Sequence, residues 1–234
     1  MSINYVLIGA MAILLIAIIV GGIRGFIKTF FAAFSVAIAL FVAVQAGPYL
    51  GKVLQHTPMY TMISGQVEEK LDAYSEAQAE KVSQQIEEIN RYPLPQYLKN
   101  ALIENNNNQI YEALGVSRFN QYVASYMACL VLNSVSFLIV FLLAFIILKV
   151  IEAGLDLISK LPVLHSINLL GGLVCGVVHG MIILWILCIV ITMFAWTEAG
   201  QWALSQVNES ALLSLLYNHN YILSALTNMG KMLF

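Results

Sequence analysis

The sequence predicts an all-α polytopic membrane protein with four transmembrane helices, an extracytoplasmic helical insertion and a C-terminal amphipathic helical tail. Of its 234 residues, 60% are hydrophobic and 10% are charged, whereas an ordinary soluble domain is about 25% charged. The mean hydropathy is +0.81. Each of four uncharged runs exceeds the ~20 residues that cross a hydrocarbon core; they are residues 1–23, 29–51, 119–148 and 161–197.

Residues 1–51 are expected to form a transmembrane hairpin. The positive charges Arg24 and Lys28 follow the first apolar run rather than precede it, which favours an uncleaved span over a signal peptide. Residues 21–28 predict a tight basic turn, in which Arg24 marks the headgroup region. The pair Gly47 and Pro48 predicts the end of the second span, because proline lacks a backbone donor.

Residues 52–118 are expected to form an extramembrane helical insertion, since they carry nine acidic against six basic side chains and no long apolar run. Their apolar side chains recur at helical spacing and predict one amphipathic helix of about seven turns; they are Ile63, Val67, Leu71, Tyr74, Val82, Ile86 and Ile89. Prolines 93 and 95, and the asparagines at 105–108, predict breaks on either side of a short helix. The long helix either covers the bundle or docks a partner helix.

Residues 119–196 predict a second transmembrane hairpin. Its first helix is expected to continue at helical spacing past Lys149, and its second to cover about residues 169–194. Glu152 and Asp156 share a helix face, but no third ligand lies nearby. We therefore expect a solvated face there rather than an acid–base or metal site.

Three glycines, Gly172, Gly176 and Gly180, recur every four residues and form one bare stripe on a helix. Because membrane helices associate through close van der Waals contact, this stripe predicts a central packing helix. His179 lies beside the stripe, and an ionisable side chain inside a membrane suggests a function. We expect a neutral ring hydrogen-bonded to a neighbouring helix, with proton relay or metal ligation as the alternatives.

Residues 197–234 predict two short amphipathic helices, at about 202–217 and 222–233, lying on the bundle or the membrane surface. The loops that join spans one to two and three to four carry four basic and two acidic side chains: Arg24, Lys28, Lys149 and Lys160 against Glu152 and Asp156. Positive loops stay in the cytoplasm. Both termini and the insertion are therefore expected to be extracytoplasmic.

The remaining chemistry-bearing residues predict no catalytic, cofactor or metal site. The odd number of cysteines, Cys129, Cys175 and Cys188, lacks metal-ligand spacing and cannot form a closed disulfide framework. There is no Gly-Xaa-Ser-Xaa-Gly elbow and no phosphate-binding Gly-Lys-Ser/Thr loop. A net charge of −2 gives no reason to expect nucleic acid.

Two motifs resemble those of the colicin V production protein (CvpA) family of bacterial inner-membrane proteins. The first is the turn formed by Gly22, Arg24, Gly25 and Phe26, and the second is Asn168-Leu-Leu-Gly-Gly followed by the glycine stripe. The resemblance covers about residues 3–46 and 127–194, which leaves the insertion and the tail as additions. Asn4 stands where relatives tend to carry an acid, and Leu169 where they often carry arginine.

The resemblance implies a protein of the bacterial inner membrane that is associated with colicin V export and envelope homeostasis. Some relatives are fused after the fourth span to extracytoplasmic serine proteases, in agreement with the orientation expected here. The expected function is a non-enzymatic scaffold or accessory factor in envelope homeostasis, secretion or bacteriocin production. An oligomeric channel or transporter component is the alternative. The expected partners are the lipid bilayer and an extracytoplasmic or membrane protein, or further copies of the chain.

Overall fold

The computed structural model describes residues 3–74, 81–154 and 165–233, and the regular structure in these ranges is helical throughout. The helices are α1 (Tyr5–Arg24), α2 (Phe26–Gln55), α3 (Pro58–Tyr74), α4 (Val82–Arg91), α5 (Gln96–Asn105), α6 (Asn108–Leu114), α7 (Phe119–Gly154), α8 (His165–Met193), α9 (Glu198–Glu209), α10 (Ala211–Asn218) and α11 (Tyr221–Leu233). Four stretches are long and apolar enough to cross a membrane: α1, α2, Phe119–Ile151 of α7 and Asn168–Met193 of α8. The predicted all-α, four-span class is confirmed.

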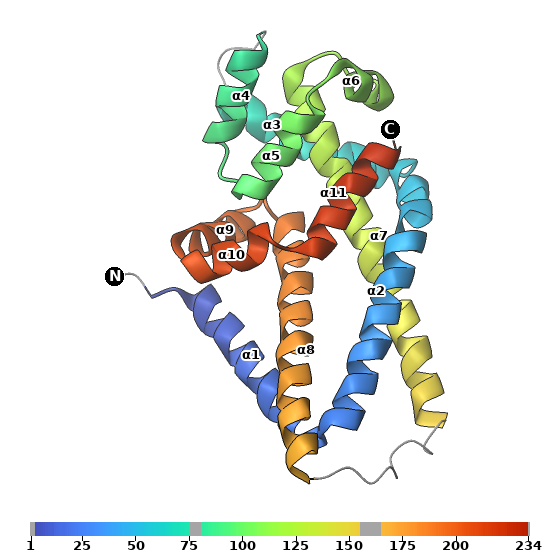
Figure 1. The fold of residues 1–234 in the computed structure, drawn as a ribbon. Helices are drawn as coiled ribbons and strands as arrows, with labels where there is room; N and C mark the ends of the chain where they lie inside the picture. Colours follow the sequence, from blue (N-terminus) through green and yellow to red (C-terminus); the bar gives the residue numbers. More distant parts are fainter. Residues whose placement is uncertain (1–2, 75–80, 155–164, 234) are drawn as a thin grey trace.

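The four long helices form a bundle in which each helix packs mainly against a helix of the other expected hairpin. Helix α1 packs mainly along α8 and α2 mainly along α7, while contacts between α2 and α8 join the two pairs. The junction between α1 and α2, the end of α7 and the start of α8 lie at one end of the bundle (Figure 1). Helices α3–α6 and α9–α11 lie at the opposite end, together with the first residues of α1. We call these seven helices the cap.

Helix α2 does not end at Gly47 and Pro48, so that prediction is wrong. The helix continues through Pro48 to Gln55, because a membrane helix tolerates proline where close packing offsets the missing hydrogen bond. The two glycines of this region allow α2 to lie against α7. A Cβ atom at Gly47 would be 3.5 Å from the Cα atom of Phe137, and one at Gly51 would be 2.5 Å from Oδ1 of Asn133.

The insertion contains several helices rather than one of seven turns. Helix α3 ends at Tyr74, and α4 begins anew after Lys81, whose backbone is extended and whose N–H donates to Gln84 Oε1. Residues 75–80 of the predicted helix lie outside the described residues. The breaks at the prolines and the asparagines are confirmed. Helix α6 was not predicted; its ends are marked by Asn107, which caps it, and by Gly115, which has a left-handed backbone.

The tail contains three helices rather than two. Ser210 has an extended backbone between α9 and α10, and its Oγ accepts a hydrogen bond from Leu213 N–H at the start of α10. The chain changes direction there, so Leu204 of α9 is buried whereas Leu215 of α10 is exposed. The predicted break before α11 is confirmed.

The cap packs onto the bundle through buried aromatic and polar side chains. The Tyr122 hydroxyl of α7 donates to the Leu102 carbonyl of α5 over 2.6 Å. The Tyr97 hydroxyl of α5 lies 2.6 Å from the Thr227 hydroxyl of α11. Trp196, just after α8, is only 7% exposed and packs edge-on against Tyr92. Insertion and tail therefore share one folded body.

Candidate functional site

The connection between the first two spans is shorter than the predicted turn of residues 21–28. Helix α1 runs to Arg24 and α2 begins at Phe26, so Gly25 is the whole connection. Its φ of +80° is a conformation that side chains disfavour. The carbonyl oxygen of Gly21 accepts hydrogen bonds from the N–H of Gly25 at 3.0 Å and from the Thr29 hydroxyl at 3.1 Å. These bonds hold the start of α2 against the end of α1.

The glycine stripe of α8 faces α1 and this turn. A Cβ atom on Gly172 would meet the carbonyl oxygen of Gly21 and the backbone of Gly25. One on Gly176 would lie 2.6 Å from the carbonyl oxygen of Ala17, and one on Gly180 would lie 3.0 Å from the Cβ atom of Ala17. The backbones of α1 and α8 therefore touch along the stripe, in the manner of small-residue membrane interfaces.

The turn motif also contacts the start of α8 through side chains. A Cβ atom on Gly22 would lie 2.8 Å from Leu173 Cδ2, and one on Gly25 would meet the Asn168 side chain. The ring of Phe26 covers Gly171, with its Cδ2 atom 2.7 Å from where a Cβ would stand. Two motifs that lie more than a hundred residues apart in the sequence thus form one site in space.

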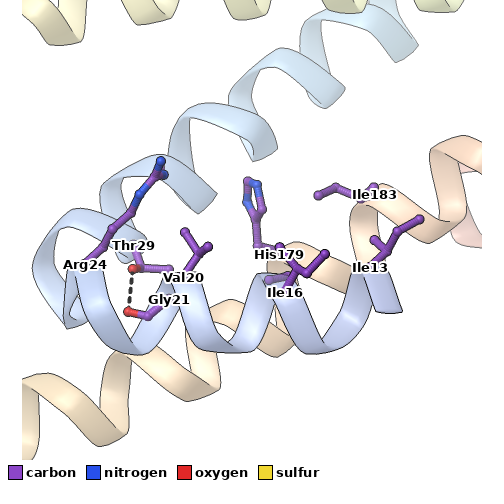
Figure 2. Close-up of a pocket in the computed structure, with 10 residues that line it drawn as sticks. Ile13, Ile16, Val20, Gly21, Arg24, Thr29, His179 and Ile183 are labelled. Carbon is purple, nitrogen blue, oxygen red and sulfur yellow. Dashed lines mark hydrogen bonds between the residues drawn. The ribbon is translucent and has the colours of Figure 1, made fainter. Parts of the chain in front are cut away.

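A pocket of about 310 Å³ lies beside this site, between α1, α2 and α8. Its walls are mainly aliphatic, and three polar side chains reach it: Arg24, Thr29 and His179. Figure 2 shows the Arg24 and His179 side chains projecting in the same direction from α1 and α8, with Val20 between them in this view. The apolar lining residues are Ile13, Ile16, Ala17, Val20, Ala32 and Ile183.

The polar groups of the pocket are incompletely satisfied by the chain itself. Thr29 is buried and donates to Gly21. Nδ1 of His179 is buried but has no hydrogen-bond partner among the described residues, so the bond expected from this ring to a neighbouring helix is not found at Nδ1. Arg24 is exposed and forms no ion pair within the described part of the chain.

Metal ligation at His179 finds no support in the ranges 3–74, 81–154 and 165–233. No group of three histidine, cysteine or acidic side chains there lies close enough to hold a metal ion. Glu152 belongs to α7 without a described side chain, and Asp156 and Lys160 lie outside the described residues. Cys129, Cys175 and Cys188 are free thiols.

The two positions that depart from the family pattern lie at opposite ends of the bundle. The Asn4 side chain caps α1 and donates from Nδ2 to the Gln206 carbonyl of α9 over 2.6 Å. Leu169, near the start of α8, lies beside Gly22 at the turn. Side chains at these two positions do not meet in this fold, whatever their charge.

Gly21 and Thr29 belong to the site but were not singled out by sequence reasoning, whereas Asn168 was named as the first residue of the second motif. Gly21 directly precedes the turn motif, so proximity to a motif was a usable signal. Thr29 carried none, because a lone threonine at the start of a membrane helix is ordinary. Its role depends on the sharp turn that brings it back to Gly21.

Residues 113–220 match the model of the colicin V production protein family. The matching family is the one that the two sequence motifs resemble. The matched residues contain spans three and four, and they continue through α9 and α10, which the resemblance had left out as an addition. Spans one and two, with the Gly22–Phe26 turn, lie outside the matched residues. Comparison with curated proteins and with solved structures gives no match.

The part that matches the colicin V production family supplies half of the site. It contributes the glycine stripe and His179, while α1 and α2 contribute Arg24 and Thr29. A cation, a hydroxyl and an imidazole above aliphatic walls suit the binding of an amphiphilic group.

Proposed function

We propose that the protein is a non-enzymatic membrane scaffold, an accessory factor in the production of colicin V or a similar secreted toxin and in envelope homeostasis. The link to toxin production rests on the family match over residues 113–220. The scaffold role rests on one structural observation: the insertion and the tail form a single packed body at one end of the bundle (Figure 1). A body of this kind suits the binding of another protein.

Polar contacts join the cap to the membrane helices. Lys70 of α3 donates from Nζ to the carbonyl of Trp196, which lies between α8 and α9. Arg118 donates to Glu68 over 3.0 Å, and Asn120 Nδ2 donates to Asp72 over 2.7 Å. These contacts join α3 to the start of α7. A preformed cap would lose less conformational entropy when a partner binds.

Helix α4 is the part of the cap that we assign to partner binding. On this helix the Ile89 side chain is fully buried, whereas the Val82 side chain is 62% exposed. Glu87 and Arg91 form an exposed ion pair on the helix surface, 2.6 Å apart. The outer surface of α4 is therefore polar and surrounds one exposed aliphatic side chain. Such a surface suits a transient protein–protein interface. We place this surface outside the cytoplasm of a bacterial inner membrane, because the short loops at the other end are basic.

Site-specific photo-crosslinking in toxin-producing cells tests this function. A crosslinker at Val82 should capture a secretion or envelope protein, whereas one at the lipid-facing Ile146 of α7 should not. Val82→Asp should reduce toxin release severalfold at an unchanged protein level, since an acid in the first turn favours the helix. Ser83→Asp adds the same charge one position along the helix and serves as the matched control.

Two results would contradict the scaffold. One is normal toxin release from Val82→Asp together with an absence of crosslinks at Val82. The other is solute or ion flux through the purified protein in proteoliposomes, which would favour the oligomeric channel.

A further inference from the structure

We propose that the pocket between α1, α2 and α8 binds one anionic phospholipid, with its phosphate at Arg24 and the upper part of one acyl chain along the aliphatic wall. At about 310 Å³, the pocket lies at the lower end of the roughly 300–1,000 Å³ range of ligand sites. This volume suits part of a lipid rather than a whole one. The rest of the lipid would remain in the bilayer.

The position of the polar groups along the bundle matches the layers of a phospholipid. Helix α1 has 20 residues and is therefore about 30 Å long, the thickness of the hydrocarbon core. Arg24, its last residue, lies at the boundary of that core. Gly176 and Gly180 both contact Ala17, so His179 lies about seven residues, or roughly 10 Å, deeper. The phosphate of a phospholipid lies at the depth of Arg24. The groups just below the headgroup lie between the depths of Arg24 and His179.

The charge of the site selects an anion. Among the described residues, Arg24 lines the pocket and no acidic side chain does. An arginine fork is well suited to phosphate oxygens. The buried Nδ1 of His179, which has no protein partner in the described ranges, offers a further hydrogen bond to a polar atom of the ligand.

The walls of the pocket select a lipid over a free ion. Ile13, Ile16, Val20 and Ile183 line it, and Ile16 is 61% exposed on the outside of the bundle. An acyl chain contacts such a surface favourably, whereas a hydrated ion gains nothing from it. The pocket is thus continuous with the lipid-facing surface of α1.

The experiment titrates the purified full-length chain, in phosphatidylcholine-containing micelles, with phosphatidylglycerol, and follows the thermal midpoint. Phosphatidylglycerol should raise the midpoint saturably, while added phosphatidylcholine and inorganic phosphate should not. Arg24→Gln should weaken the apparent affinity about tenfold, as expected for one charge-assisted contact. Lys28→Gln is the matched control, because Lys28 is an exposed cation at the same end that does not line the pocket; it should change the affinity less than about twofold.

Ile16→Trp tests the site without changing its charge. This exposed position tolerates a larger side chain, which would occupy the aliphatic wall and should abolish the phosphatidylglycerol effect. The proposal is overturned if this variant retains full affinity, or if Arg24→Gln and Lys28→Gln lose affinity equally. A shift with phosphate alone, or an equal shift with phosphatidylcholine, also overturns it.

Discussion

Gly21 and Gly172 touch backbone to backbone, and each occupies the space that a side chain on the other would need. A Cβ atom on Gly172 would meet the carbonyl oxygen of Gly21, and one on Gly21 would meet the carbonyl oxygen of Gly172. The same Gly21 oxygen accepts the two hydrogen bonds that close the turn into α2. The α1–α8 interface and the turn are therefore coupled through one peptide group.

The glycine stripe should be sensitive to single methyl groups in a graded way. Gly176→Ala places a Cβ atom 2.6 Å from a backbone oxygen, which moves only if a helix moves, and should cost about 1–3 kcal/mol of unfolding free energy. Gly180→Ala should cost less, because its nearest contacts, Ala17 Cβ and Leu14 Cδ1, are 3.0 Å away and belong to side chains, of which Leu14 can rotate. Thermal midpoints in detergent measure the difference.

Gly9→Ala is the control for this series, since no atom of the described residues lies within 4 Å of its Cβ position. It should leave the midpoint unchanged. Val174, which is 65% exposed on the other side of α8, should likewise accept leucine. Equal losses for Gly9→Ala and Gly176→Ala would show that the stripe is not a packing surface.

Alanine substitutions at Gly22 and Gly25 should differ in how far stability is restored when the contacting side chain is shortened. The contact at Gly22 is with the Leu173 side chain, so Leu173→Ala should restore part of the stability lost in Gly22→Ala. Gly25→Ala combines a contact with Asn168 and a φ of +80°, and the backbone strain of about 1–3 kcal/mol remains when Asn168 is shortened. Double-mutant cycles on midpoints should show positive coupling for the first pair and little rescue for the second. Full rescue of Gly25→Ala by Asn168→Ala would contradict the role assigned to the turn.

The fold class and the number of spans followed from composition and uncharged runs, because these set the solvent of each segment. The pairing of the spans did not follow. The glycine stripe of α8 indicated close packing, but it does not identify the helix against which α8 packs. The partner is α1 because Gly21 and the small side chain of Ala17 lie opposite the stripe, and this is a property of two helices together.

The ends of helices were predicted less well than the existence of helices, because local packing and capping decide where a helix ends. Pro48 signalled a helix end, but packing against Phe137 and Asn133 kept α2 intact. Spacing joined residues 63–89 into one helix, but Lys81 starts a new one. The site was predicted in part. Both motifs were recognised in the sequence, but the pocket that they form with Thr29 depends on the sharp turn at Gly25, which only the structure shows.

Asn220 should be the polar side chain on which attachment of the tail depends. It is 3% exposed, its Nδ2 donates to the Trp185 carbonyl over 2.9 Å, and its Oδ1 accepts from the N–H groups of Ile222 and Leu223. Asn220→Ala removes a helix cap and an interhelix bond, and should lower the unfolding free energy by about 2–3 kcal/mol. Asn208→Ala, on the exposed side of α9, should have no measurable effect. A denaturant titration of both variants checks this, and equal stability would argue against the anchor.

The orientation of the chain is testable by cysteine labelling after the three native cysteines are replaced by serine or alanine. A cysteine at Gln84 of α4 or Ser205 of α9, both exposed on the cap, should react with a membrane-impermeant thiol reagent added to spheroplasts. A cysteine at Ser159, between α7 and α8 in sequence but outside the described residues, should be protected until the membrane is permeabilised. Labelling of Ser159 alone would invert the topology.

His179 separates a structural role from a binding role. If its ring held a neighbouring helix by a hydrogen bond, His179→Leu would destabilise the bundle, and His179→Gln would preserve it. The buried Nδ1 atom has no partner in the described part of the chain, and the wall around the ring is aliphatic. Removing an unsatisfied buried polar group relieves its desolvation cost of about 1–3 kcal/mol. We therefore expect His179→Leu to melt at or above the wild-type temperature in detergent.

The same variant should nevertheless lose function if the pocket binds a ligand. In toxin-producing cells, His179→Leu should release less toxin than the wild type at an equal protein level, while His179→Gln, which keeps a donor, should be intermediate. A proton relay predicts instead that both variants fail equally, because neither side chain cycles a proton near neutral pH. A Leu variant that melts several degrees lower would restore the structural role, and one that is stable and fully active would remove His179 from the site.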